Sequence, residues 1–169
     1  MKIVVFIIAE KVFRDEEYLV PKEVLAKAGI KVITASTTTG EAIGKLGLKV
    51  KPDTLVSQID VDKLDALIFI GGGGAEQYFN DPIAHRLAKE AVEKEKILGA
   101  ICIAPVILAN AGLLKGKRAT VFPSGADSLK KGGATYTGGD VEIDGKLITG
   151  CGPEAAEKFG TELVKMLLP

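Results

Sequence analysis

One cysteine occupies a position at which its thiol could act as a nucleophile. Cys102 follows the apolar run Ile97–Ile101, which is typical of a buried strand, and precedes a helix-like segment that contains Pro105. Proline suits the first turn of a helix because its missing N–H needs no partner there. The pattern therefore predicts a strand-to-helix turn that holds Cys102 on a sharp bend, next to a helix N-terminus that lowers the thiol pKa below about 8.5. The alternative is a small, unreactive core residue.

Two further groups are expected near Cys102, because sites in parallel α/β sheets lie at the carboxyl ends of the strands. Gly71–Gly74 directly follow the apolar run Leu64–Ile70, and their N–H groups together with that of Ile103 form a candidate oxyanion hole. A tight turn is the alternative for these glycines. Glu17 follows the first strand, and in its protonated form it would hydrogen-bond to a thiolate and act as a general acid and base. The alternative for Glu17 is a carboxylate that only stabilises a helix N-terminus.

Residue counts exclude several other kinds of site. The only histidine is His85, which follows Asp81-Pro82 in a polar helical segment and is interpreted as a surface residue. Neither a Cys–His dyad nor a multi-histidine metal site is therefore expected. Cys102 and Cys151 are the only cysteines, which disfavours a disulfide framework and a cysteine-rich zinc site. The glycine run lacks the residues of the phosphate-binding motifs.

The chain length and the charge balance limit the classes of protein to which this sequence can belong. A chain of 169 residues is expected to form one domain, residues 1–169, with a sizeable core. Lys+Arg and Asp+Glu both number 22, so no basic surface for nucleic acid is predicted. No apolar run is long enough to cross a membrane, and the N-terminal residues lack the features of a signal peptide. These observations predict a cytoplasmic protein with neither nucleic acid nor membrane as a partner.

Apolar runs alternate with helical periods, which predicts an α/β fold with a mostly parallel sheet and helices on both faces. Strands are expected at Lys2–Ala9, Ile30–Ala35, Leu64–Ile70, Ile97–Ile101 and Arg118–Phe122. Helices are expected around Val20–Ala28, from Asp81 onward, after Cys102, at Asp127–Lys131 as a single turn, and over Glu154–Leu168. Short hairpins are expected within Ser36–Val50 and around Asp144-Gly145, whereas Glu10–Glu17 is expected to be a loop that enters the first helix.

The cysteine motif has a recognisable continuation. Gly99–Pro105 (GAICIAP), followed by Leu108–Lys117 (LANAGLLKGK), resembles the ThiJ/PfpI superfamily, above all the branch that contains the parkinsonism-associated deglycase. The resemblance covers essentially the whole chain, since similar motifs occur at Arg14–Pro21, Lys27–Val32, Gly71-Gly72, Thr149 and Gly152-Pro153. It implies a flavodoxin-like sandwich of the class I glutamine amidotransferase type, a homodimer or a hexamer, and no cofactor. It also places Glu17 at the family's thiol-pairing glutamate and Gly71 and Gly72 at its oxyanion glycines.

The resemblance implies a reactive cysteine, and several activities are compatible with it. The first expectation is a stress-response protein of the glyoxalase or deglycase type. In it, Cys102 would form a hemithioacetal with a small reactive carbonyl or glycated substrate, and Glu17 would move the proton. A redox sensor or chaperone that works through oxidation of Cys102 is the second. A PfpI-type intracellular cysteine peptidase or amidase is the third, and a plain binding module remains if Phe122 blocks the site.

Three positions depart from the family pattern. Ile103 stands where the protease branch has a histidine after its nucleophile, which disfavours a peptidase. Phe122 stands where the deglycase branch has a histidine before proline, so Glu17 would work without an imidazole. Cys151 stands where the family often has an arginine near the nucleophile. It is interpreted as a packed turn residue or, alternatively, as a second thiol that forms a disulfide with oxidised Cys102.

Overall fold

A seven-stranded sheet forms the centre of the protein, which the computed structural model describes from Met1 to Pro169. All neighbouring strands in it run parallel, except the two strands of one hairpin at the edge. The buried apolar runs in its middle are those that the sequence predicts, because central parallel strands are covered on both faces. In spatial order the strands are β11 (Val141–Asp144), β12 (Leu147–Gly150), β8 (Ile97–Ile101), β7 (Ala66–Phe69), β1 (Ile3–Ile7), β3 (Lys31–Ser36) and β6 (Thr54–Leu55).

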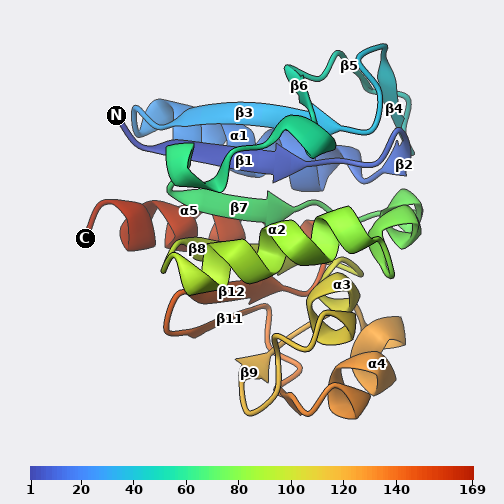
Figure 1. Ribbon diagram of the computed structural model, residues 1–169, viewed down its shortest axis with the longest axis vertical. Coiled ribbons are helices and arrows are strands. Elements are labelled where there is room, and N and C mark those ends of the chain that lie inside the picture. The colour runs from blue at the N-terminus through green and yellow to red at the C-terminus, as the bar shows by residue number, and fades with distance from the viewer.

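Helices cover both faces of this sheet, which confirms the predicted α/β sandwich (Figure 1). Helices α1 (Asp15–Lys27) and α5 (Ala156–Leu167) pack against each other on one face. Helix α2 (Pro82–Glu93) lies on the other face, beside two short 3-10 segments, Val56–Gln58 and Val61–Lys63. The short helices α3 (Pro105–Asn110) and α4 (Ala126–Lys131) lie near the carboxyl ends of the strands.

A continuous apolar core joins the sheet to its helices. It includes the fully buried rings of Phe6, Phe69 and Phe159, which come from β1, β7 and α5. Burial of a large apolar side chain stabilises a fold by about 1.5–3 kcal/mol relative to exposure. The carboxyl ends of β1, β7 and β8 are therefore held in fixed positions, and these ends carry the residues expected to form a site. No helix is long and apolar enough to span a lipid bilayer.

The predicted fifth strand of the sheet, Arg118–Phe122, is wrong in extent and in place. Only Arg118–Ala119 form a strand, β9, and it pairs with β10 (Thr135–Tyr136) in a separate two-stranded sheet. Strand β12 takes the place beside β8 instead. The N–H of Thr120 donates to Thr149 Oγ1 at 3.0 Å, so a side chain of β12 satisfies it in place of a backbone ladder.

The predicted loop Glu10–Glu17 contains a strand that the sequence pattern does not reveal. Strand β2 (Lys11–Phe13) joins β4 (Ala42–Gly44) and β5 (Lys49–Val50) in a three-stranded sheet, and β4–β5 is the predicted hairpin. Strand β2 is only three residues long and its register shifts within it, so it shows no alternating pattern. The buried Asp15 carboxylate accepts the N–H groups of Leu46 and Leu48, both at 2.9 Å, which ties the hairpin tip to α1.

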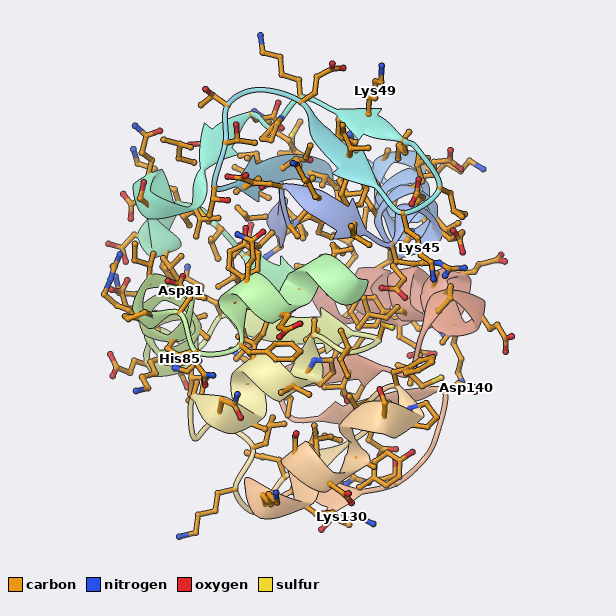
Figure 2. The ribbon with its side chains drawn as sticks, turned by 90° about the vertical axis from the view of Figure 1, so that its right-hand side faces the viewer. Lys45, Lys49, Asp81, His85, Lys130 and Asp140 are labelled. Carbon is orange, nitrogen blue, oxygen red and sulfur yellow. The ribbon has the colours of Figure 1, made fainter.

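The carboxyl edge of the sheet is the face seen in Figure 2. Lys49 of the hairpin lies at its top, with Lys45 below it on the right; Lys130 of α4 lies at its bottom, and His85 and Asp140 lie on opposite sides. Both chain termini lie at the other edge of the sheet, on the left in Figure 1.

Candidate active site at the carboxyl edge of the sheet

Cys102 occupies the bend between β8 and α3, as the sequence predicts. Its φ of +64° is uncommon for a residue with a side chain and represents local backbone strain. Two backbone hydrogen bonds hold this conformation: the Cys102 N–H donates to the Gly150 carbonyl at 2.8 Å, and its carbonyl accepts the Phe122 N–H at 2.7 Å. The residue as a whole is 8% exposed and is therefore buried.

Glu17 lies in the first turn of α1 and reaches Cys102 across Gly71. A Cβ atom on Gly71 would lie 2.5 Å from both Cys102 Cβ and Glu17 Oε1, so only glycine leaves room for the two side chains to approach. The Glu17 side chain is 0% exposed, and neither of its carboxyl oxygens has a hydrogen-bond partner of normal geometry. The structure thus brings together three residues that lie far apart in the sequence and that were all candidates from it.

Burial dominates the proton equilibria of this pair. Loss of solvent raises the pKa of Glu17 to about 7, although the Cys102 thiol, the Arg14 guanidinium and the Gly71 N–H all favour the carboxylate. Burial and the neighbouring Glu17 carboxylate raise the pKa of Cys102 to about 12. The two side chains form one coupled system that loses its first proton near neutral pH and its second at strongly alkaline pH.

The predicted lowering of the Cys102 pKa is therefore wrong. The N–H groups of Gly72 and Ile103 do favour the thiolate, but burial and Glu17 outweigh them. Helix α3 contributes little because it has six residues and begins three residues beyond the thiol. Attack by Cys102 consequently requires a base that takes its proton during the reaction, and Glu17 is the adjacent candidate.

The candidate oxyanion donors divide into two groups. The N–H groups of Gly72 and Ile103 face the sulfur of Cys102, whereas the N–H of Gly71 faces Glu17. Gly72 has a φ of +102°, and a Cβ atom there would lie 2.5 Å from Val12 O and Arg14 N. Glycine is thus required at this position both by the backbone conformation and by the close approach of β2.

Phe122 and Cys151, the two further candidates from the sequence, have different surroundings. Phe122 is 43% exposed, and its ring lies 3.6 Å from the position of a Cβ atom on Gly152. The half-buried Cys151 follows β12 and directs its thiol toward Asp140 Oδ1 at 3.9 Å. Both cysteines are free thiols, so the structure contains no Cys102–Cys151 disulfide.

His85 is not the plain surface residue that its polar helix indicated. It is half-buried, and its Nε2 lies 2.8 Å from the Phe79 carbonyl. It lies at the start of α2, on the side of the carboxyl edge opposite Asp140 (Figure 2). No group of three or more His, Cys, Asp or Glu side chains is arranged to hold a metal ion.

Arg14 is the residue of this region that sequence reasoning missed. Its backbone N–H donates to the Gly71 carbonyl at 2.9 Å, and its side chain pairs with Glu16. A cation at the N-terminus of a helix opposes the helix dipole, so Arg14 directly before α1 was a signal that another interaction fixes it there.

At the carboxyl edge of this flavodoxin-like sheet, one glycine separates a buried thiol from a buried carboxyl group. This arrangement defines a class of proteins with a cysteine elbow. The model of the DJ-1/PfpI family matches residues 1–166, and the chain belongs to that family.

Individual relatives agree with this assignment. A Methanocaldococcus jannaschii protein described as uncharacterized is 41% identical over 167 residues, which cover 97% of this chain and 82% of the relative. A Pyrococcus abyssi protein named a deglycase is 31% identical over 163 residues, which cover 96% of this chain and 98% of the relative. The crystal structure of a ThiJ/PfpI domain protein from Brachyspira murdochii superimposes with a TM-score of 0.96 at 31% identity, over 98% of this chain and 95% of that one. The family and fold predicted from the sequence are confirmed.

Proposed function

We propose that this protein is a cysteine-dependent enzyme that converts small 2-oxoaldehydes such as methylglyoxal to 2-hydroxy acids. The observation that carries the proposal is the fully buried Glu17 carboxyl group, without a hydrogen-bond partner of normal geometry, beside the Cys102 thiol. A thiol with a raised pKa needs a base next to it, and a carboxylate whose pKa is about 7 accepts and returns a proton near neutral pH. The deglycase name of the Pyrococcus abyssi relative supports carbonyl compounds as the substrate class.

In the first step, the Cys102 sulfur bonds to the aldehyde carbon and the thiol proton passes to the Glu17 carboxylate. The former carbonyl oxygen becomes an oxyanion, which the Gly72 and Ile103 N–H groups stabilise. Protonation of this oxygen by Glu17 gives a hemithioacetal and restores the carboxylate, which completes the addition without any change in oxidation state.

In the second step, Glu17 removes the proton from the carbon that carries the sulfur, and the electron pair moves to form an enediol. The neighbouring carbonyl oxygen takes the proton from Glu17 as the enediol forms. Glu17 then accepts the hydroxyl proton of the sulfur-bearing carbon and delivers a proton to the neighbouring carbon, which gives a thioester of the 2-hydroxy acid and restores the carboxylate. Water hydrolyses the thioester and releases lactate and the free thiol. Ile103 and Phe122 supply no imidazole, and His85 contacts the Phe79 carbonyl, so Glu17 carries every proton transfer in this scheme.

The experiment measures lactate formed from methylglyoxal by the wild type and by the Cys102→Ser, Glu17→Gln and Cys151→Ser variants. We expect saturable turnover in the wild type and in Cys151→Ser, and a loss of about 100-fold or more in the other two, because each removes a group that reacts. Lactate must be measured because any thiol captures aldehydes and depletes methylglyoxal. Absence of lactate with the wild type, or undiminished turnover in Cys102→Ser, contradicts the proposal.

A redox sensor is a second candidate, favoured by the same unpartnered carboxyl group. Oxidation of Cys102 by peroxide to a sulfinate would place an anion where protonated Glu17, Gly72 N–H and Ile103 N–H can donate to it. Thiol counting after dilute peroxide distinguishes the modes: loss of one thiol per chain fits oxidation of Cys102 alone. Loss of both thiols without crosslinked dimers fits a disulfide with Cys151.

A further inference from the structure

We propose that the Arg14–Glu16 ion pair controls the pH at which Glu17 can accept the proton of Cys102, so that Arg14 and Glu16 are positioning residues that act in opposite directions. This inference rests on the proposed function and deepens it, because it names the residues that control Glu17, the base in that reaction. It applies to two residues that do not touch the reacting atoms in the scheme above.

The pair is fixed next to the dyad by its geometry. Arg14 is the residue before α1 and lies one helical turn ahead of Glu17. Its Nε and Nη2 atoms both lie 2.9 Å from Glu16 Oε2, and its backbone N–H holds the carbonyl of Gly71, the residue between Glu17 and Cys102. The guanidinium therefore cannot drift far from the dyad.

The ion pair is partly shielded from water. The Arg14 and Glu16 side chains are 27% and 35% exposed, and the Glu16 Oε1 atom is enclosed without a hydrogen-bond partner. Glu16 thus depends on Arg14 for the neutralisation of its charge. Screening by water and salt is weaker for partly enclosed charges than for exposed ones, so both charges are felt at Glu17.

The charged and titratable groups that face Glu17 come from two elements. Cys102 faces it from the turn after β8, and Arg14 and Glu16 face it from its own helix. Arg14 lowers the pKa of Glu17 and Glu16 raises it, while the guanidinium is in turn stabilised by Glu16, Glu17 and Cys102. The two members of the ion pair therefore act on Glu17 with opposite signs.

The test is the pH dependence of Cys102 alkylation by iodoacetamide between pH 5 and 9, in a Cys151→Ser background that leaves one thiol. Arg14→Met should move the midpoint upward by about 0.5–1 pH unit, because the cation that favours the Glu17 carboxylate is gone. Glu16→Gln should move it downward by a similar amount, because an anion is removed and Arg14 loses its counter-charge. Arg14→Lys keeps the charge and should restore most of the wild-type midpoint.

A matched control uses the Arg86–Glu90 pair of α2, whose atoms are 3.0 Å apart. Arg86→Met and Glu90→Gln should leave the midpoint unchanged. The proposal is overturned if Arg14→Met and Glu16→Gln shift the midpoint in the same direction, which damage to the fold would also produce, or if neither shifts it more than the control. Thermal unfolding of each variant identifies loss of folding directly, and Arg14→Lys tests the charge with the smallest change in shape.

Alkylation reports on the dyad whether or not lactate is formed. Absence of lactate with opposite shifts in the alkylation midpoint would contradict the proposed function and leave the inference on Arg14 and Glu16 intact. Lactate formation without shifts in the alkylation midpoint would support the proposed function and contradict the inference on Arg14 and Glu16.

Discussion

Cys102 and Cys151 each follow the last residue of a strand, and the two strands are parallel neighbours in which Ile101 pairs with Gly150. Their surroundings nevertheless differ. Cys102 has a positive φ and faces the fully buried Glu17, whereas Cys151 has an ordinary backbone conformation and faces the exposed Asp140 at the rim seen in Figure 2.

The two cysteines share a position in the fold but differ in the chemistry of their surroundings. Both thiols lie at the carboxyl edge of the sheet, and a carboxyl group raises the pKa of each. Glu17 is enclosed, so it is poised to change its protonation near neutral pH and to serve as a base. Asp140 is open to solvent, where a carboxylate beside a thiol mainly repels the thiolate. An enclosed carboxyl group, rather than the strand end alone, distinguishes the candidate nucleophile.

The largest expected effect comes from Gly71→Ala. This substitution separates the Cys102 thiol from an enclosed carboxyl group, and Cys151 has no such neighbour. The alanine methyl group would lie 2.5 Å from Cys102 Cβ, Glu17 Oε1 and the Ile101 carbonyl, so thiol and carboxyl must separate. We expect Cys102 alkylation to slow by about 100-fold, in line with the loss of a positioned base, and the fold to lose about 1–3 kcal/mol from overpacking. Alkylation rates and urea unfolding measure the two effects.

Gly73→Ala is the matched control for this substitution. Its Cβ atom would meet only Val12 Cγ1, at an ordinary 3.7 Å. Equal losses in the two variants would show that any change in the glycine run disturbs the site, and would refute the role assigned to Gly71.

The next effect concerns stability, and it tests the enclosure of Glu17. Its pKa is raised from 4.5 to about 7 by folding, so between these values the folded protein binds more protons than the unfolded chain. Stability from this group is complete below pH 4.5 and declines as the pH rises through 7, by about 3 kcal/mol in total. Glu17→Gln does not titrate, so its stability relative to the wild type should improve by about that amount between pH 4.5 and 8. Urea unfolding across this range checks it, and parallel curves for the two proteins would contradict an enclosed Glu17.

The smallest effect concerns the other cysteine. Burial and the Asp140 carboxylate raise the pKa of Cys151, so Asp140→Asn should speed alkylation of Cys151 at pH 8 by a few-fold. Cys102 should react at its former rate in the same protein, as peptide mapping of the alkylated residues can show. A comparable acceleration of Cys102 would mean that the two thiol environments are coupled.

The sequence was sufficient for the middle strands of the central sheet and for grouping the candidate residues at its edge. Long apolar runs identify β1, β7 and β8, since a strand covered on both faces carries few polar residues. Glycines, a turn cysteine and an acidic residue that follow such runs meet at the same edge of the sheet, so Cys102, Glu17 and Gly71 could be grouped in advance.

Other features depend on partners that no local pattern specifies. Strand β2 is a short bulged segment whose extended form depends on β4, a remote stretch of chain. Arg118–Phe122 has the composition of a strand, yet Thr149 of β12 binds the backbone that would have formed the ladder. The direction of the Cys102 pKa shift follows from the burial of the thiol and from the neighbouring Glu17 carboxylate, and composition and spacing do not determine that depth of burial.

The location of the two chain ends has a practical consequence. Both lie at the edge of the sheet opposite the dyad (Figure 1). An affinity tag, a fused fluorescent reporter or a tether to a sensor surface can therefore be attached at either end without covering Cys102. The protein can be immobilised in an orientation that leaves its thiol facing the sample.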